Sequence, residues 1–105
     1  MSITKLAIKL ASPLPQLESF SRCLFIGPHP DDIEIGAGAT AAKLAENGKT
    51  VAFLCCIDGR YGSAAVPPEE LIPIRQAEAK ASAAALGVSD VRFLPFCDGG
   101  FYDAR

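Results

Sequence analysis

Hydrophobic residues along the chain gather in three short runs, and the two segments between these runs have a different, helical spacing. The runs end at a glycine, an aspartate and a proline, and they cover residues 23–26, 50–57 and 91–94. Their apolar residues are continuous rather than alternating, which is typical of parallel strands that are covered on both faces of a sheet. We therefore predict three buried parallel strands.

Each of the two intervening segments has the features of an amphipathic helix. In the first segment, Gly48 stands where a helix would end, and the apolar residues that would share one helical face are Ile33, Ala37, Ala41 and Leu44. The second segment begins with the sequence PPEE at residues 67–70, which puts two acids at the positive end of a helix dipole. This helix is predicted to stop at Gly87.

The order strand, helix, strand, helix, strand predicts an α/β fold of the Rossmann-like βαβαβ type, with a parallel sheet and right-handed crossovers. A chain of 105 residues is long enough for one small domain, so residues 1–105 are taken as a single domain. The N-terminal part is less regular. Residues 1–20 are interpreted as an arm or an extra edge strand, with a short helix over residues 13–20 as a further option.

The composition argues against several classes of partner. The net charge is -2 and the ten Lys and Arg residues are scattered, so no surface for nucleic acid or for an anionic membrane is expected. The N-terminal residues lack the long apolar run of a signal peptide or a membrane helix, so we expect a cytoplasmic protein without membrane insertion. The four cysteines lack CxxC spacing and are expected to be buried, reduced thiols rather than a zinc cluster.

The residues that are most informative about function follow the first predicted strand, in the sequence PHPDDIE at residues 28–34. In open α/β sheets, ligands bind beyond the carboxyl ends of the strands, which is where this segment lies. His29, the single histidine of the chain, and a carboxylate three residues later can bind the same divalent cation. Of the adjacent Asp31 and Asp32, one can bind the metal while the other accepts a proton from water. The alternative is that one of these acids only caps the following helix.

The longer sequence PHPDDIEIGAG, at residues 28–38, resembles the signature of the LmbE-like (PIG-L) family of zinc-dependent N-deacetylases. This family includes N-acetylglucosaminyl-phosphatidylinositol deacetylases and the bacterial deacetylases of mycothiol and bacillithiol synthesis. Further similarities to the family are the sequence DG at residues 58–59, Arg75 and Glu78 in the second predicted helix, and FCDG at residues 96–99. The resemblance implies that the chain is the N-terminal portion of an LmbE-like domain.

The resemblance also implies roles for the motif residues. His29 and Asp32 would be ligands of Zn²⁺ or another divalent metal, Asp31 would be the general base, and Glu34 would support the loop. In the family a later histidine supplies the third protein ligand, and this sequence has no second histidine. Because catalytic zinc normally takes three protein ligands, the chain is interpreted as the N-terminal part of a longer enzyme. The alternative is a noncatalytic, truncated or degenerate module.

The reaction implied by the resemblance is the removal of an acetyl group from an N-acetylglucosamine conjugate or a related small N-acyl compound. Three further polar residues are candidates for binding this small-molecule substrate, namely Arg75, Arg60 and Asp98. Arg75 has the alternative of a surface ion pair with Glu78, one helical turn later. Ordinary turn formation is the alternative for Arg60 and Asp98.

A weaker alternative is a nucleotide-binding α/β domain. The sequence GAGATA at residues 36–41 fits the dinucleotide fingerprint, and Asp58 follows at a suitable distance. However, that fingerprint must form the tight turn directly after a strand, whereas these glycines fall inside a predicted helix. Close packing of the helix on the sheet is the simpler role for Gly36 and Gly38.

A partial parallel sheet has a consequence for the behaviour of the isolated chain. Its edge strand would expose unpaired backbone groups next to apolar side chains, which favours contact with other chains. We therefore predict that the isolated chain self-associates into a homo-oligomer or is poorly stable.

Overall fold

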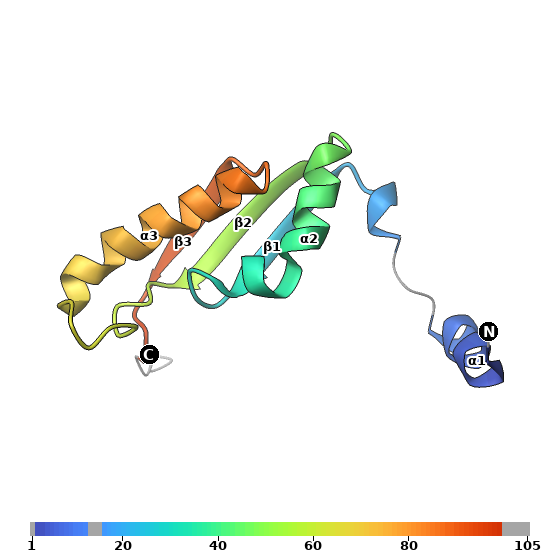
Figure 1. The fold of residues 1–105 in the computed structure, drawn as a ribbon, viewed down its shortest axis with the longest axis horizontal. Helices are drawn as coiled ribbons and strands as arrows, with labels where there is room; N and C mark the ends of the chain where they lie inside the picture. Colours follow the sequence, from blue (N-terminus) through green and yellow to red (C-terminus); the bar gives the residue numbers. More distant parts are fainter. Residues whose placement is uncertain (1, 13–15, 100–105) are drawn as a thin grey trace, which may run out of the picture.

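The computed structural model describes residues 2–12 and 16–99, and it confirms the predicted order of strands and helices. The described strands form one parallel sheet in the order β1-β2-β3, and a helix connects each strand to the next (Figure 1). The elements along the chain are α1 (Ile3–Ala11), the 3-10 helix η1 (Leu17–Ser19), β1 (Arg22–Gly27), α2 (Asp32–Glu46), β2 (Thr50–Ile57), α3 (Pro68–Ala85) and β3 (Asp90–Phe96).

The hydrophobic core lies between the sheet and the two connecting helices. Val51, Phe53 and Cys55 alternate along β2, and all three are buried in one cluster. The ring of Phe53 meets that of Phe25 edge to face, with the ring centroids 5.8 Å apart, a geometry that aromatic pairs prefer. Residues from α2 and α3 complete this cluster, and they are Ile33, Ala41, Leu44 and Ala83. Both helices therefore cover the same face of the sheet.

The prediction that the strands are covered on both faces is wrong for the described part of the chain. Leu24 and Ile26 are 59% and 64% exposed, and they alternate along β1 with residues that pack against the core. The strands follow one another in space as they do in sequence, so two right-handed crossovers place both helices on one side. The other side of the sheet keeps an exposed apolar row. The apolarity of the strands alone does not reveal which face of the sheet the connecting helices cover, so the sequence pattern did not predict this open face.

Of the two options for residues 1–20, an arm or an extra edge strand, the edge strand is absent from the described residues before β1, which contain the helices α1 and η1. α1 extends away from the sheet, and none of its residues is buried (Figure 1). The short helix expected within residues 13–20 is the 3-10 helix η1, while residues 13–15 lie outside the described ranges. No helix in these ranges is both long and apolar enough to cross a membrane.

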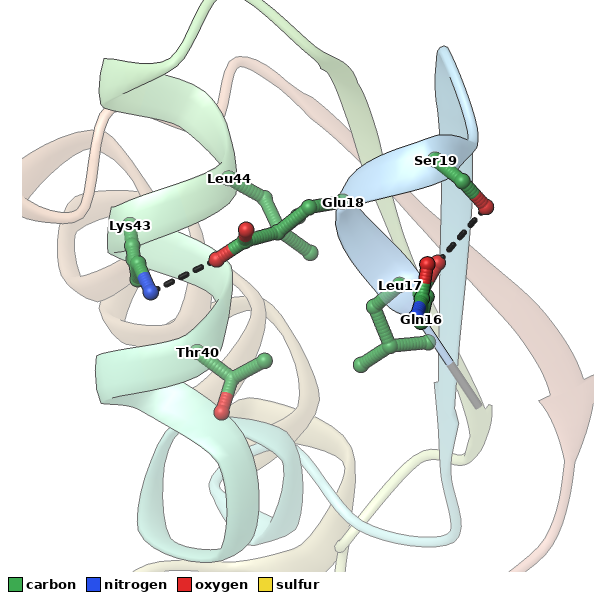
Figure 2. A pocket seen from close by; sticks show the side chains of 7 residues that line it. All are labelled: Gln16, Leu17, Glu18, Ser19, Thr40, Lys43 and Leu44. Atoms are coloured by element: carbon green, nitrogen blue, oxygen red, sulfur yellow. Dashed lines mark hydrogen bonds and ion pairs between the residues drawn. The ribbon is translucent and has the colours of Figure 1, made fainter. Parts of the chain in front are cut away.

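A groove separates η1 from α2, and Figure 2 shows the side chains around it. Nζ of Lys43 lies 2.6 Å from Oε1 of Glu18 across this groove, and both side chains are exposed, so the pair adds little stability. The groove lies beside η1, which precedes β1, and ligands of open α/β sheets bind at the opposite, carboxyl ends of the strands. The residues that line it are Gln16, Leu17, Glu18, Ser19, Thr40, Lys43 and Leu44.

The substitution Ile26→Lys is expected to weaken self-association of the chain without unfolding it, because this side chain is 64% exposed on the open sheet face. A charge there opposes apolar contact between chains. Sedimentation velocity over a range of concentrations measures the association. Ile35→Lys is the matched control, since Ile35 is 79% exposed on α2 and away from that face. A parent chain that stays monomeric and stable throughout contradicts the prediction, as does an equal effect of both substitutions.

Candidate functional site

The motif loop begins at the carboxyl end of β1, and two local features fix its path. Gly27 allows the close turn, because a Cβ atom at this position would come 2.6 Å from Cγ1 of Ile33. The backbone N–H of Ile57 donates to the carbonyl of Pro28 at 2.7 Å, which attaches the loop to the end of β2. The loop is therefore held at the sheet edge where the sequence placed the site.

The structure brings the two predicted metal ligands together at the start of α2. Nδ1 of His29 lies 3.2 Å from Oδ2 of Asp32, and the backbone N–H of His29 donates to the same oxygen at 3.0 Å. Two atoms that each bind a tetrahedral zinc ion at about 2.0–2.1 Å are about 3.3 Å apart, so this separation fits a shared cation. Within residues 2–12 and 16–99, no cluster of three or more His, Cys, Asp or Glu side chains is arranged to hold a metal.

Asp31 occupies the N-cap position of α2, but its side chain makes no capping hydrogen bond to the helix. Oδ2 of Asp31 instead accepts a hydrogen bond from Nη2 of Arg75 at 3.0 Å. The same guanidinium donates to the carbonyl of Pro30 at 3.1 Å and to Oε2 of Glu78 at 2.6 Å. Arg75 thus forms the ion pair considered from the sequence and, in addition, connects α3 to the motif loop.

His29 lies between two carboxylates. Its Nε2 atom is 3.2 Å from Oδ1 of Asp98, which follows β3 and is 69 residues away in sequence. Burial lowers the pKa of the His29 imidazole, but the hydrogen bonds to Asp98 and Asp32 outweigh this effect and raise its pKa above the ordinary value of 6.5. Local spacing predicted the contact with Asp32, whereas the contact with Asp98 depends on how the strands pair.

The buried carboxylate of Asp58 holds the loops after β2 and β3 together, a role that the sequence did not predict. Asp58 is 7% exposed, and its Oδ2 accepts hydrogen bonds from Nε and Nη2 of Arg60 at 2.9 and 2.6 Å. Its Oδ1 accepts from the backbone N–H of Asp98 at 3.3 Å, and its own N–H donates to the carbonyl of Phe96 at 3.0 Å. The hydrogen bonds from Arg60 lower the pKa of Asp58 although burial opposes this shift.

A surface cavity of about 420 Å³ opens beside these groups. Its lining includes four of the predicted site residues and three residues of the surrounding loops, and consists of His29, Pro30, Asp31, Gly59, Gly62, Arg75 and Asp98. Asp32, Arg60 and Glu34 are outside this lining. The guanidinium of Arg60 is bound to Asp58 and does not line this cavity.

The cysteines are all free thiols, as the sequence indicated, but only Cys55 is fully buried. Burial, together with the negative charge of Glu34, raises the pKa of Cys55 to about 11. A thiol with this pKa stays protonated at neutral pH and is a poor metal ligand or nucleophile. Glu34 itself lies in the first turn of α2, and its expected role in supporting the loop stays a prediction.

The family model described as "PIG-L: GlcNAc-PI de-N-acetylase" matches residues 24–105 of the chain. This chain belongs to the PIG-L family. The match includes the PHPDDIE motif and the segments after β2 and β3, so the resemblance seen in the sequence is confirmed.

Curated relatives of this PIG-L chain are deacetylases of small acetylated sugars. A 1D-myo-inositol 2-acetamido-2-deoxy-alpha-D-glucopyranoside deacetylase of Kineococcus radiotolerans is 42% identical over 100 residues, covering 90% of the chain and 27% of the relative. The diacetylchitobiose deacetylase of Thermococcus kodakarensis is 38% identical over 98 residues, covering 91% of the chain and 36% of the relative. The chain therefore spans roughly a third of the length of the relatives it matches.

Two solved structures share the fold of the PIG-L chain. The N,N'-diacetylchitobiose deacetylase from Pyrococcus horikoshii, complexed with an inhibitor, matches with a TM-score of 0.71 and 32% identity, over 93% of this chain and 40% of that one. The 4-carboxy-2-hydroxymuconate hydratase GalB from Pseudomonas putida KT2440 matches with a TM-score of 0.64 and 26% identity, over 82% of this chain and 37% of that one. The same fold thus occurs in an amide hydrolase and in a hydratase.

The glycines that fit the nucleotide fingerprint lie inside α2, as the sequence predicted, and do not form the turn after β1. The prediction that both glycines pack the helix on the sheet is wrong for the described residues. Gly38 is buried, and a Cβ atom there would lie 3.6 Å from Leu86, so this glycine packs against the end of α3 rather than against the sheet. Gly36 is exposed, and a Cβ atom there would meet none of the described residues within 4 Å, so it has no packing role among them.

Asp58→Asn is expected to lower the free energy of unfolding by about 1–3 kcal/mol at pH 7, because a buried charged acceptor for Arg60 and Asp98 is lost. The pKa of Asp58 is lowered on folding, so its contribution is present above the unfolded value near 3.8 and disappears as the pH falls through the folded value. Urea denaturation at pH 7 and at pH 3 should therefore show a difference between parent and variant that shrinks in acid. The control is Asp90→Asn, which removes an exposed pair with Arg92. An equal effect of both variants contradicts the prediction.

Proposed function

We propose that the protein carrying this PIG-L domain is a zinc-dependent hydrolase that removes the acetyl group from an N-acetylglucosamine conjugate or a related small N-acyl compound. The observation that carries the proposal is the 3.2 Å separation of His29 Nδ1 and Asp32 Oδ2, with Asp31 at the adjoining cavity. The names of the relatives, which include an acetylated glucosaminyl-inositol and diacetylchitobiose as substrates, support the substrate class. A cytoplasmic location stays a prediction.

His29 and Asp32 would hold the cation, and a mixed nitrogen and oxygen donor pair suits zinc. When bound, zinc supplies a Lewis acid that polarises a carbonyl group and acidifies a water molecule. The family resemblance implies that a histidine beyond this sequence completes the ligand set. Both side chains are about two-fifths exposed, so the pair is accessible from solvent.

Asp31 is the proposed general base. Its side chain is 46% exposed and lines the cavity, and Arg75 holds one of its carboxylate oxygens at 3.0 Å. In this position Asp31 accepts a proton from the water that attacks the acetyl carbon. A protonated group then returns a proton to the departing nitrogen, so that the C–N bond breaks and acetate and a free amine are formed.

Arg75 is the proposed contact for a substrate hydroxyl group, because its side chain lines the cavity. Arg75 is 27% exposed and keeps part of its guanidinium near the opening. We assign Arg60 a different task, which is to hold the buried carboxylate of Asp58 and through it the loop that carries Asp98. This role explains why Arg60 follows β2 but does not line the cavity.

A hydratase is the second candidate, and the likeness to GalB favours it. Hydration also requires a positioned base and an activated water, so Asp31 and the His29–Asp32 pair would serve either reaction. The two reactions leave different products. Release of acetate and a primary amine supports the amide hydrolase, whereas addition of water across a C=C bond without acetate supports the hydratase.

Asp31→Asn in the complete zinc-loaded protein is expected to lower kcat by about 10²- to 10⁴-fold, because the amide cannot accept the proton from water. Acetate released from N,N'-diacetylchitobiose and from an N-acetylglucosaminyl-inositol measures the activity. Asp90→Asn, an exposed change on β3, is the matched control and should retain full activity. Undiminished kcat in the Asp31 variant contradicts the base assignment.

His29→Gln and Asp32→Asn are each expected to weaken zinc binding by more than about 100-fold, which exceeds the loss typical of outer-shell changes. Equilibrium dialysis with metal analysis measures the affinity. Asp31→Asn serves as the control, since a base that does not bind the metal should leave affinity nearly unchanged. Full zinc content in the His29 variant contradicts the ligand assignment, and a noncatalytic module would show no specific zinc in the parent protein.

A further inference from the structure

The two ring nitrogens of His29 have different carboxylate neighbours. Nδ1 lies 3.2 Å from Oδ2 of Asp32, and Nε2 lies 3.2 Å from Oδ1 of Asp98. A neutral imidazole carries one N–H, so it can donate to only one of these carboxylates at a time. The neighbour that accepts this proton therefore determines which nitrogen keeps a lone pair.

The carboxylate of Asp98 is not a loose surface group. Its side chain is 23% exposed, and its backbone N–H donates to Oδ1 of the buried Asp58 at 3.3 Å. Asp58 is in turn held by Arg60, and its own N–H donates to the carbonyl of Phe96 at the end of β3. These hydrogen bonds hold the backbone of Asp98 at the ends of β2 and β3. The backbone position from which the Asp98 carboxylate reaches His29 is therefore fixed.

A histidine that binds a metal through one nitrogen commonly donates its other N–H to a carboxylate, which fixes both the tautomer and the ring orientation. We infer that Asp98 is a positioning residue that accepts the Nε2–H of His29, so that the Nδ1 lone pair faces Asp32 and a cation between them. This inference rests on the proposed function, since it gives a purpose to the His29–Asp32 pair. It assigns Asp98 a task other than binding a substrate hydroxyl.

Asp32 is the other possible acceptor of the His29 ring proton, and this competition makes the role of Asp98 necessary. Without Asp98, the carboxylate of Asp32 is the acceptor that stays beside the ring, and it would draw the proton to Nδ1. That tautomer places an N–H where the cation has to bind. By accepting the proton at Nε2, Asp98 prevents a hydrogen bond from Nδ1–H of His29 to Asp32, which would occupy the nitrogen that has to bind the cation.

The His29 signals of the complete protein, assigned by their loss in His29→Gln, allow a direct test. In ¹⁵N NMR spectra at a pH where the ring is neutral, the parent protein should show His29 as the Nε2–H tautomer. Asp98→Ala should move the ring toward the Nδ1–H tautomer, and Asp98→Asn, whose amide oxygen can still accept a proton, should lie between the two. Amide-shift dispersion in the same samples reports whether each variant is folded, and Asp90→Asn is the matched control.

Zinc titration of the same samples, followed through the His29 signals, gives the second readout. Asp98→Ala is expected to weaken zinc binding by about 10- to 100-fold, as is typical for loss of an outer-shell carboxylate. Equal tautomer and equal zinc affinity in parent and folded Asp98→Ala overturn the inference and leave the proposed function standing. A higher KM in the complete enzyme with unchanged zinc affinity also overturns it, in favour of a substrate contact. If zinc does not perturb His29 in the parent, the metal pair fails, and the positioning role fails with it.

Discussion

The close approach of the His29 imidazole to the Asp32 carboxylate is the interaction on which the chemistry of this site depends. The 3.2 Å separation of Nδ1 and Oδ2 arises locally, between residues three apart in sequence, and the backbone N–H of His29 also donates to Asp32. The carbonyl of Pro28 accepts a hydrogen bond from the N–H of Ile57 at the end of β2, which holds the motif loop against the sheet. The parallel sheet therefore positions the metal pair through the backbone.

Groups from the three strand ends gather around this pair in an order set by the topology. The loop after β1 supplies the pair itself, the segment after β2 supplies the buried Asp58, and the segment after β3 supplies Asp98. Arg75 reaches the same place from α3 and holds Asp31. Most of the polar groups at the cavity are thus engaged with one another, which limits the orientations available to the two proposed ligands and the proposed base.

Local patterns in the sequence were sufficient for the elements and for the motif, because both depend on neighbouring residues. The apolar runs, the PPEE sequence and the glycines that end the helices indicated the βαβαβ order, and the spacing of His29 and Asp32 indicated their contact. Contacts between distant residues were beyond such patterns. Arg75 and Asp31 are 44 residues apart, and His29 and Asp98 are 69 apart, so these pairings appear only when the strands are assembled. The same limit explains the open sheet face, which depends on the side taken by the crossovers.

The central claim, that His29 and Asp32 bind one divalent cation, is tested most directly by anomalous diffraction at the zinc edge from crystals of the zinc-loaded protein. We expect one zinc ion about 2.0–2.2 Å from both Nδ1 of His29 and a carboxylate oxygen of Asp32. A zinc ion bound elsewhere, or bound to His29 through Nε2 with Asp32 outside its coordination sphere, would contradict the claim.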